Sequence, residues 1–230
     1  MVRLDIKELK FDKNIFVKIM QIGLPAGVQS AVFAIANIVI QSAINSLGTV
    51  VIAASSAAFN IEILAYYVLN SFSQACTTFV GQNYGAGDVK RCKKTLILCL
   101  IEDAIASASA IVLILICGKS LLSIFSSDPQ VIEIGYTRLL LVFSAYTFTM
   151  LYENISGYLR GFGISLVPAI LTIIGVCVVR VIWIYTVFPK SRTFSTIMMA
   201  YPISLSVTAL LMFLALMFYR PSKKYAAHEV

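Results

Sequence analysis

Long apolar segments alternate with short polar breaks along most of the chain. The breaks contain glycine, proline or neighbouring serines, as at residues 47–48, 81–87, 126–129, 160–163 and 188–191. A bilayer core about 30 Å thick requires roughly 20 residues of helix. The pattern therefore predicts six transmembrane helices, at residues 16–45, 51–80, 92–117, 133–158, 164–188 and 196–219.

Composition strengthens this prediction. Of the 230 residues, 59% are hydrophobic and only 13% are charged, and the mean hydropathy is +0.89. A water-soluble domain of this length is much less apolar. We expect an all-α integral membrane protein that crosses the cell membrane several times. A charged amphipathic leader (1–15) and a polar tail (220–230) flank the transmembrane lobe (16–219).

Positive charge follows an alternating topology. Of eighteen Lys and Arg residues, five lie in residues 1–18, four in the break after the second span, one at Arg160 and three in the tail. These thirteen fall on one side of the predicted membrane, which the positive-inside rule assigns to the cytoplasm. Both termini are expected there. The distribution of the net charge of +7 therefore indicates a protein whose partner is the lipid bilayer, and it does not indicate nucleic-acid binding.

The chain offers little for enzyme chemistry or metal binding. Its single histidine, His228, lies in the polar tail, and its five cysteines contain no CxxC pair. We expect no catalytic residue, no metal site and no cofactor. A lipid-linked enzyme is disfavoured for the same reason.

Polar residues recur at helical spacing in three spans and share one face of each predicted helix. They are Gln29, Asn37, Gln41 and Asn45 in the first span, Glu62, Tyr66, Asn70, Gln74 and Thr77 in the second, and Tyr146, Thr149, Glu153 and Ser156 in the fourth. Such residues either join neighbouring helices by hydrogen bonds or line a cavity. Both interpretations stay open, and the second makes these residues candidates for a substrate or ion pathway.

Charged residues within the spans are the strongest site candidates because they are costly in a membrane. Glu62 and Arg180 are both predicted in the outer half, so we hypothesise that they form an ion pair. Alternatively, Arg180 extends to the membrane surface. Arg138 and Glu133 lie close enough to a span end to reach the interface.

Three further acids are predicted in the inner half of the membrane: Glu102, Asp103 and Glu153. If their helices are neighbours, the cluster is a candidate proton or sodium site. In the competing interpretation, the third helix begins later and Glu102 and Asp103 lie among the headgroups.

The break after the second span carries a specific motif. It reads FVGQNYGAGDVKRCKK (79–94), and Gly81, Gly85 and Gly87 can adopt the positive φ angles of a tight turn. Together with IGLPAGVQSAVFAIANIVIQSAINSLG (22–48), AAFNIE (57–62) and GYLRGFG (157–163), this segment resembles the multidrug and toxic compound extrusion (MATE) family, in its DinF-like branch.

The resemblance implies a fold and a function. Complete members have two six-helix lobes, and this chain resembles the carboxy-terminal lobe. They export cationic or amphipathic small molecules in exchange for protons or sodium. The resemblance assigns Gln82 and Asn83 to turn and helix-end hydrogen bonds in the glycine motif, with a structural or gating role.

The chain also departs from the family pattern. Phe33 occupies the position where other branches have an acid, eight residues after Pro25, and Ile164 replaces the aspartate of the RGxGD pattern. The acid linked to proton coupling in the DinF-like branch belongs to the other lobe. We therefore expect a half-length transporter that acts as a homodimer or with a separate amino-terminal lobe. The alternative is an inactive truncated or split-gene fragment.

Overall fold

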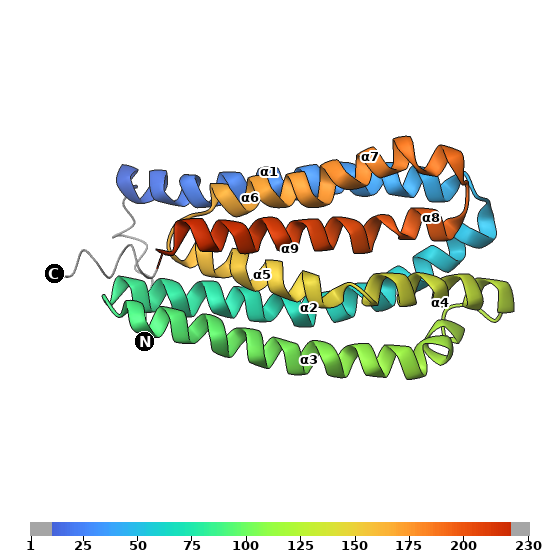
Figure 1. The fold of residues 1–230 in the computed structure, drawn as a ribbon, viewed down its shortest axis with the longest axis horizontal. Helices are drawn as coiled ribbons and strands as arrows, with labels where there is room; N and C mark the ends of the chain where they lie inside the picture. Colours follow the sequence, from blue (N-terminus) through green and yellow to red (C-terminus); the bar gives the residue numbers. More distant parts are fainter. Residues whose placement is uncertain (1–10, 222–230) are drawn as a thin grey trace.

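The computed structural model describes residues 11–221, so most of the expected leader and tail lies outside the described residues. The described chain forms long helices that run roughly parallel to one another (Figure 1). They are α1 (Lys13–Asn45), α2 (Thr49–Gly85), α3 (Val89–Ser123), α4 (Pro129–Phe143), α5 (Tyr146–Gly161), α6 (Leu166–Thr172), a π-helical segment (Ile173–Val178), α7 (Val179–Thr186), a 3₁₀ turn (Phe188–Lys190), α8 (Phe194–Met198) and α9 (Ala200–Tyr219).

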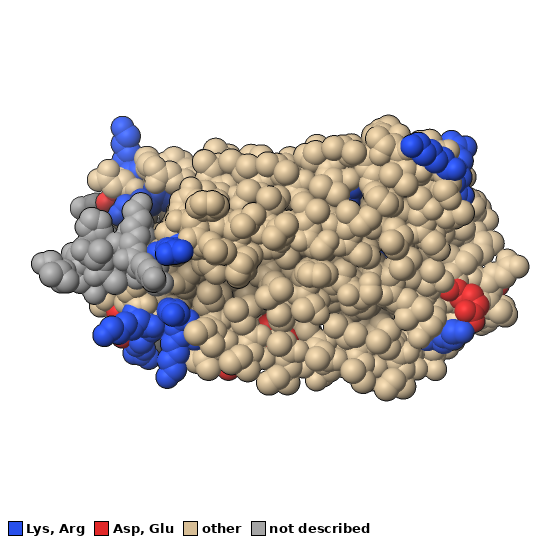
Figure 2. Space-filling view, viewed as in Figure 1, with Lys and Arg blue, Asp and Glu red and all other residues tan. Residues whose placement is uncertain are grey.

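The helices confirm an all-helical membrane protein. Within residues 11–221, five helical segments are long and apolar enough to cross a bilayer, and α4 with α5 passes the same test as a bent pair, which makes six. Figure 2 shows why this assignment is physically reasonable: Lys and Arg gather at the two ends of the molecule, and few charged atoms interrupt the belt between them.

The helices form two groups on either side of α9. Helix α1 packs against α6, the π-helical segment and α7, whereas α2 packs mainly against α3, α4 and α5 (Figure 1). Helices α1 and α2 are consecutive in sequence, but they make few contacts with each other. A cavity between them is lined by polar residues that the sequence predicts, among them Gln29 and Glu62.

The fourth predicted span is not one straight helix. Helices α4 and α5 meet at an angle of 47°, with Ser144 and Ala145 between them. The buried rings of Phe143 and Tyr146 pack with their centroids 4.5 Å apart across this break. The Tyr146 hydroxyl donates a hydrogen bond to the backbone carbonyl of Glu62 (3.3 Å) and thereby holds the start of α5 against the middle of α2.

The glycine motif differs from the predicted turn. Gly81 lies inside α2 and Gly85 is its last residue, so the prediction that both adopt turn conformations is wrong. Among the three glycines of the motif only Gly87 has a positive φ, +78°. The backbone carbonyls of Gln82 and Asn83 accept hydrogen bonds from the amides of Ala86 (3.0 Å) and Asp88 (2.9 Å), which confirms that they lie at the helix end.

Small residues let α2 and α5 approach closely. A Cβ atom added to Gly157 would lie 2.4 Å from the Ser73 carbonyl oxygen, and one added to Gly161 would lie 2.6 Å from Val80. The Ser73 hydroxyl also donates to the Glu153 carbonyl (2.8 Å). The close approach and this hydrogen bond together fix the distance and rotation of α5 relative to α2.

Candidate functional site

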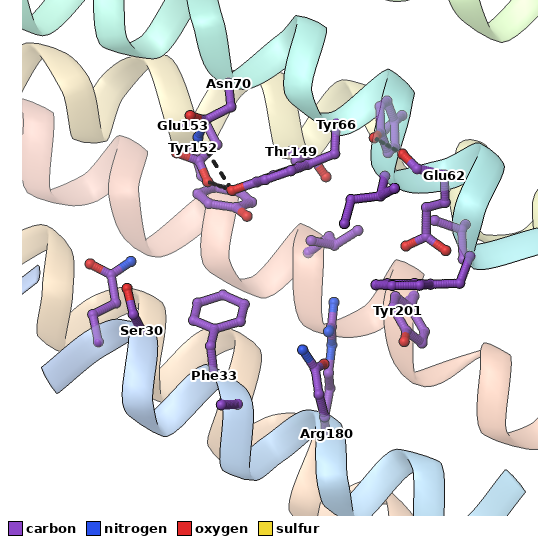
Figure 3. A pocket seen from close by; sticks show the side chains of 18 of the residues that line it. Ser30, Phe33, Glu62, Tyr66, Asn70, Thr149, Tyr152, Glu153, Arg180 and Tyr201 are labelled. Atoms are coloured by element: carbon purple, nitrogen blue, oxygen red, sulfur yellow. Dashed lines mark hydrogen bonds between the residues drawn. The ribbon is translucent and has the colours of Figure 1, made fainter. Parts of the chain in front are cut away.

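A cavity of about 520 Å³ lies between α1 and α2. Helices α5, α7 and α9 form its inner wall. Figure 3 shows Ser30 and Phe33 pointing into it from α1, opposite Glu62, Tyr66 and Asn70 of α2. Its volume falls in the range of small-molecule sites. The cavity therefore defines the candidate site.

The polar face of α2 forms one wall of the cavity. Glu62, Tyr66, Asn70 and Gln74 all line it, so their helical spacing corresponds to one surface. Hydrogen bonds run along this face from Gln74 Nε2 to Asn70 Oδ1 (3.5 Å), from Asn70 Nδ2 to Tyr66 Oη (3.3 Å) and from Tyr66 Oη to Glu153 Oε1 (3.1 Å). Both sequence interpretations therefore describe this face: it lines the cavity, and its Tyr66 joins α2 to α5 by a hydrogen bond.

The predicted residues of α1 divide between two cavities. Gln29 lines the main cavity, and Asn37 lines both it and a neighbouring cavity of about 350 Å³. Gln41 lines the smaller one and donates from Nε2 to Asn45 Oδ1 (2.8 Å). The smaller cavity extends the polar surface toward the α1–α2 turn.

Helix α5 contributes Tyr146, Thr149 and Glu153 to the main cavity. The Glu153 carboxylate accepts a hydrogen bond from Tyr66 and lies 3.8 Å from Arg160 Nη2. Arg160, which the sequence pattern places in a cytoplasmic loop, is the penultimate residue of α5 and lines the cavity. Its Nε (3.1 Å) and Nη2 (2.6 Å) both donate hydrogen bonds to Ser156 Oγ.

The predicted Glu62–Arg180 ion pair is wrong. Glu62 Oε2 instead accepts hydrogen bonds from Arg138 Nε (3.0 Å) and Nη2 (2.8 Å), and Arg138 Nη1 donates to Ser55 Oγ (2.6 Å). Arg138 is only 3% exposed, so the expectation that it reaches the membrane surface is also wrong. Glu133 is exposed and pairs with Lys119, as its place near a helix end indicates.

Arg180 lies in the wall of the main cavity and is 5% exposed. Its Nε donates to Ser204 Oγ (2.9 Å), and its guanidinium carbon lies 4.0 Å from the centroid of the Tyr201 ring. This arrangement contradicts the alternative in which Arg180 extends to the surface. A π-helical segment ends at Val178, two residues before Arg180, and changes the direction in which the following side chains point.

The predicted cluster of three acids does not form. Glu102 is exposed on the outside of α3, whereas Asp103, the next residue, is fully buried between α3 and α5. Asp103 accepts hydrogen bonds from Asn154 Nδ2 (2.6 Å) and the Ser107 hydroxyl (2.9 Å). Adjacent residues of a helix point about 100° apart, which is why both acids cannot face α5. Among the described residues, no group of three or more His, Cys, Asp or Glu side chains is arranged to hold a metal ion.

The sequence patterns missed several residues of the cavity wall, including Tyr152, Arg160 and Tyr201. Tyr152 and Tyr201 follow no polar periodicity, so no local signal separates them from core aromatic residues. Arg138, which lines the smaller cavity, did carry a signal in the sequence, namely a charge within an apolar segment.

The fold and the cavity define a multi-pass helical membrane protein with a polar, charged cavity between its helices. The chain belongs to the MatE family, whose model matches residues 25–186.

Two similar proteins are both named as probable multidrug resistance proteins, and both are longer than this chain. The chain is 30% identical to the "Probable multidrug resistance protein NorM" of Chromobacterium violaceum over 159 residues, 69% of this chain and 34% of that protein. It is 23% identical to the "Probable multidrug resistance protein YoeA" of Bacillus subtilis over 207 residues, 89% of this chain and 44% of that protein. The chain thus spans about a third to less than half of these relatives.

The chain also matches about half of each of two solved structures. A MATE protein crystallised in a bent conformation superposes with a TM-score of 0.86 at 20% identity, covering 98% of this chain and 50% of that one. An outward-facing MATE family transporter gives a TM-score of 0.84 at 19% identity, covering 97% of this chain and 51% of that one. These likenesses establish the fold.

Proposed function

We propose that this chain is the carboxy-terminal lobe of a DinF-like MATE exporter. It would move cationic or amphipathic small molecules out of the cell in exchange for protons or sodium. The supporting observation is a polar cavity that lies open between α1 and α2, in a chain that matches half of complete MATE structures.

A second lobe would complete the transport pathway. The wall of the cavity comes from one lobe only, and substrate sites of two-lobe transporters lie where the lobes meet. The second lobe is either a separate amino-terminal lobe or a second copy of this chain. An inactive truncated or split-gene fragment is the competing possibility.

The charge distribution supports a definite orientation. Exposed Lys and Arg residues cluster at the end of the molecule that holds both described termini and the α2–α3 turn: Lys13, Lys18, Lys90, Arg91, Lys93, Lys94 and Arg220. The other end has Lys119, Lys190 and Arg192, and Figure 2 shows both groups. By the positive-inside rule the first end faces the cytoplasm.

Glu153 is the proposed coupling residue. It is a buried carboxylate in the cavity wall, and Tyr66 and Arg160 contact it. A proton that binds Glu153 removes negative charge from the wall and weakens its attraction for Arg160 and for any positive group in the cavity. Binding of a proton and binding of a positive group of the substrate would thereby oppose each other, which is the requirement for exchange. Glu62 is less suited because Arg138 occupies its carboxylate.

Two measurements test the proposed function. The mass of the purified protein in mild detergent reports whether it is a monomer, a homodimer or bound to another lobe. Export of a cationic dye from vesicles under a proton or sodium gradient reports transport. A strictly monomeric protein without dye export would support the fragment interpretation and contradict a transporter.

The Glu153→Gln variant tests ion coupling. We expect dye export to lose its dependence on the pH gradient, because glutamine cannot exchange a proton. Glu133→Gln is the matched control, since Glu133 is exposed and remote from the cavity wall. Unchanged pH dependence in Glu153→Gln, with export intact, would exclude Glu153 as the coupling residue.

A further inference from the structure

The charged residues around the main cavity are unevenly paired. Its wall contains two acids, Glu62 and Glu153, and each has its own arginine: Arg138 contacts Glu62 at 2.8 Å and Arg160 lies 3.8 Å from Glu153. Arg180 is the remaining charged residue of the wall, and it forms no ion pair with the described residues. The Arg180 guanidinium is therefore the charged group of the wall that no described carboxylate contacts.

The two buried arginines differ in what remains available for a ligand. Arg138 uses Nε, Nη1 and Nη2 to bond Glu62 and Ser55. Arg180 uses only Nε, in its bond to Ser204, and within residues 11–221 no acceptor bonds its two terminal NH₂ groups. An arginine carries five N–H donors, so Arg180 retains four that lie in the cavity wall.

The surroundings of Arg180 hold the guanidinium in place and leave its terminal groups available. The Tyr201 ring lies under it at 4.0 Å, and the bond to Ser204 fixes Nε. Figure 3 shows its side chain reaching between Phe33 and Tyr201 toward the α2 face. A planar, aromatic-stacked guanidinium with free parallel donors is suited to bind a carboxylate or another oxyanion through two hydrogen bonds.

We propose that Arg180 is the binding residue for an anionic group of the transported molecule, whose aromatic or apolar part lies along Phe33 and Tyr201. The preferred substrates are then amphipathic aromatic compounds that carry a carboxylate or similar oxyanion. A compound without an oxyanion would leave the terminal groups of Arg180 without an acceptor. This assignment rests on the proposed function for its transport role, but the binding itself can be measured separately.

The test compares three probes that share one fluorophore: dansylglycine, which is anionic, dansylglycinamide, which is neutral, and dansyl-ethylenediamine, which is cationic. Fluorescence titration of the purified protein in mild detergent gives each dissociation constant. We expect dansylglycine to bind at least about tenfold more tightly than the amide, as a charge-assisted pair of hydrogen bonds contributes on the order of 1.5–3 kcal/mol. The cationic probe should bind most weakly.

Variants test whether Arg180 causes the preference for dansylglycine. Arg180→Gln should weaken dansylglycine binding at least about tenfold and change dansylglycinamide binding by less than about twofold. Arg180→Lys keeps the charge but loses the paired donors, and should give an intermediate value. Arg192→Gln, at an exposed site outside the cavity wall, should match the unmodified protein.

Two results would overturn the proposal: equal affinity of the unmodified protein for the three probes, or equal loss of all three in Arg180→Gln. The first comparison needs no variant and is therefore independent of whether a variant folds. Selective dansylglycine binding without export of either the cationic dye or dansylglycine would reject the proposed transport function and leave this site supported. Export of cationic dye without any preference for the anionic probe would support the transport function and reject the Arg180 site.

Discussion

Removing the charge of Glu62 should destabilise the protein strongly. In Glu62→Gln, Arg138 loses the carboxylate that accepts two of its hydrogen bonds and remains as a buried cation. The side chains of Arg138 and Glu62 are only 4% and 14% exposed, so water replaces little of the lost interaction. Breaking one side of such a buried pair costs about 3–5 kcal/mol.

A thermal-shift assay in mild detergent measures this effect. At roughly 2–4 °C per kcal/mol for a chain of this size, the melting temperature should fall on the order of 10 °C. Glu133→Gln provides the control within the same chain, because the Lys119–Glu133 pair is 52% and 64% exposed. An exposed pair contributes less than about 1 kcal/mol, so this variant should melt within roughly 3 °C of the unmodified protein.

A double variant separates the pair from other effects of the substitution. Glu62→Gln with Arg138→Met removes both charges, and we expect it to be more stable than Glu62→Gln alone because no buried charge remains unpaired. Two results would contradict the energetic role assigned to the buried pair. The first is a melting temperature of Glu62→Gln no lower than that of Glu133→Gln. The second is a loss of stability in the double variant that exceeds the sum of the losses in Glu62→Gln and Arg138→Met.

Two other substitutions probe the packing behind the cavity. Gly157→Ala should destabilise the protein by about 1–3 kcal/mol or more, since its Cβ would lie 2.4 Å from the Ser73 carbonyl oxygen. In the control Gly27→Ala, the added Cβ has no atom within 4 Å, so this variant should be neutral or slightly stabilising. Equal melting temperatures of the two variants would refute the close contact at Gly157. Asp103→Ala removes one of the two acceptors of the buried Asn154 amide and the acceptor of the Ser107 hydroxyl, and should cost about 1–3 kcal/mol. Asp103→Asn, which keeps an acceptor oxygen, should cost less, and the reverse order would contradict the hydrogen-bond arrangement.

Much of the site could be predicted from local spacing. Glu62, Tyr66, Asn70 and Gln74 recur every four residues, and all four line one cavity because a helix brings such positions onto one face. Grouping Glu102 with Asp103 and Glu153 by depth in the membrane failed, since consecutive residues of a helix point about 100° apart. Periodicity therefore predicts which residues share a face, but not what that face contacts.

Hydrophobic length and charge placement are properties of the sequence alone, and they determined that this is a multi-pass helical membrane protein with polar helix faces. Only the tertiary structure decided that Glu62 pairs with Arg138 and that Arg180 forms no ion pair within residues 11–221. The physical reason is that an ion pair depends on the depth and rotation of two helices. Those are set by packing at Gly157, by the 47° bend between α4 and α5 and by the π-helical segment before Arg180.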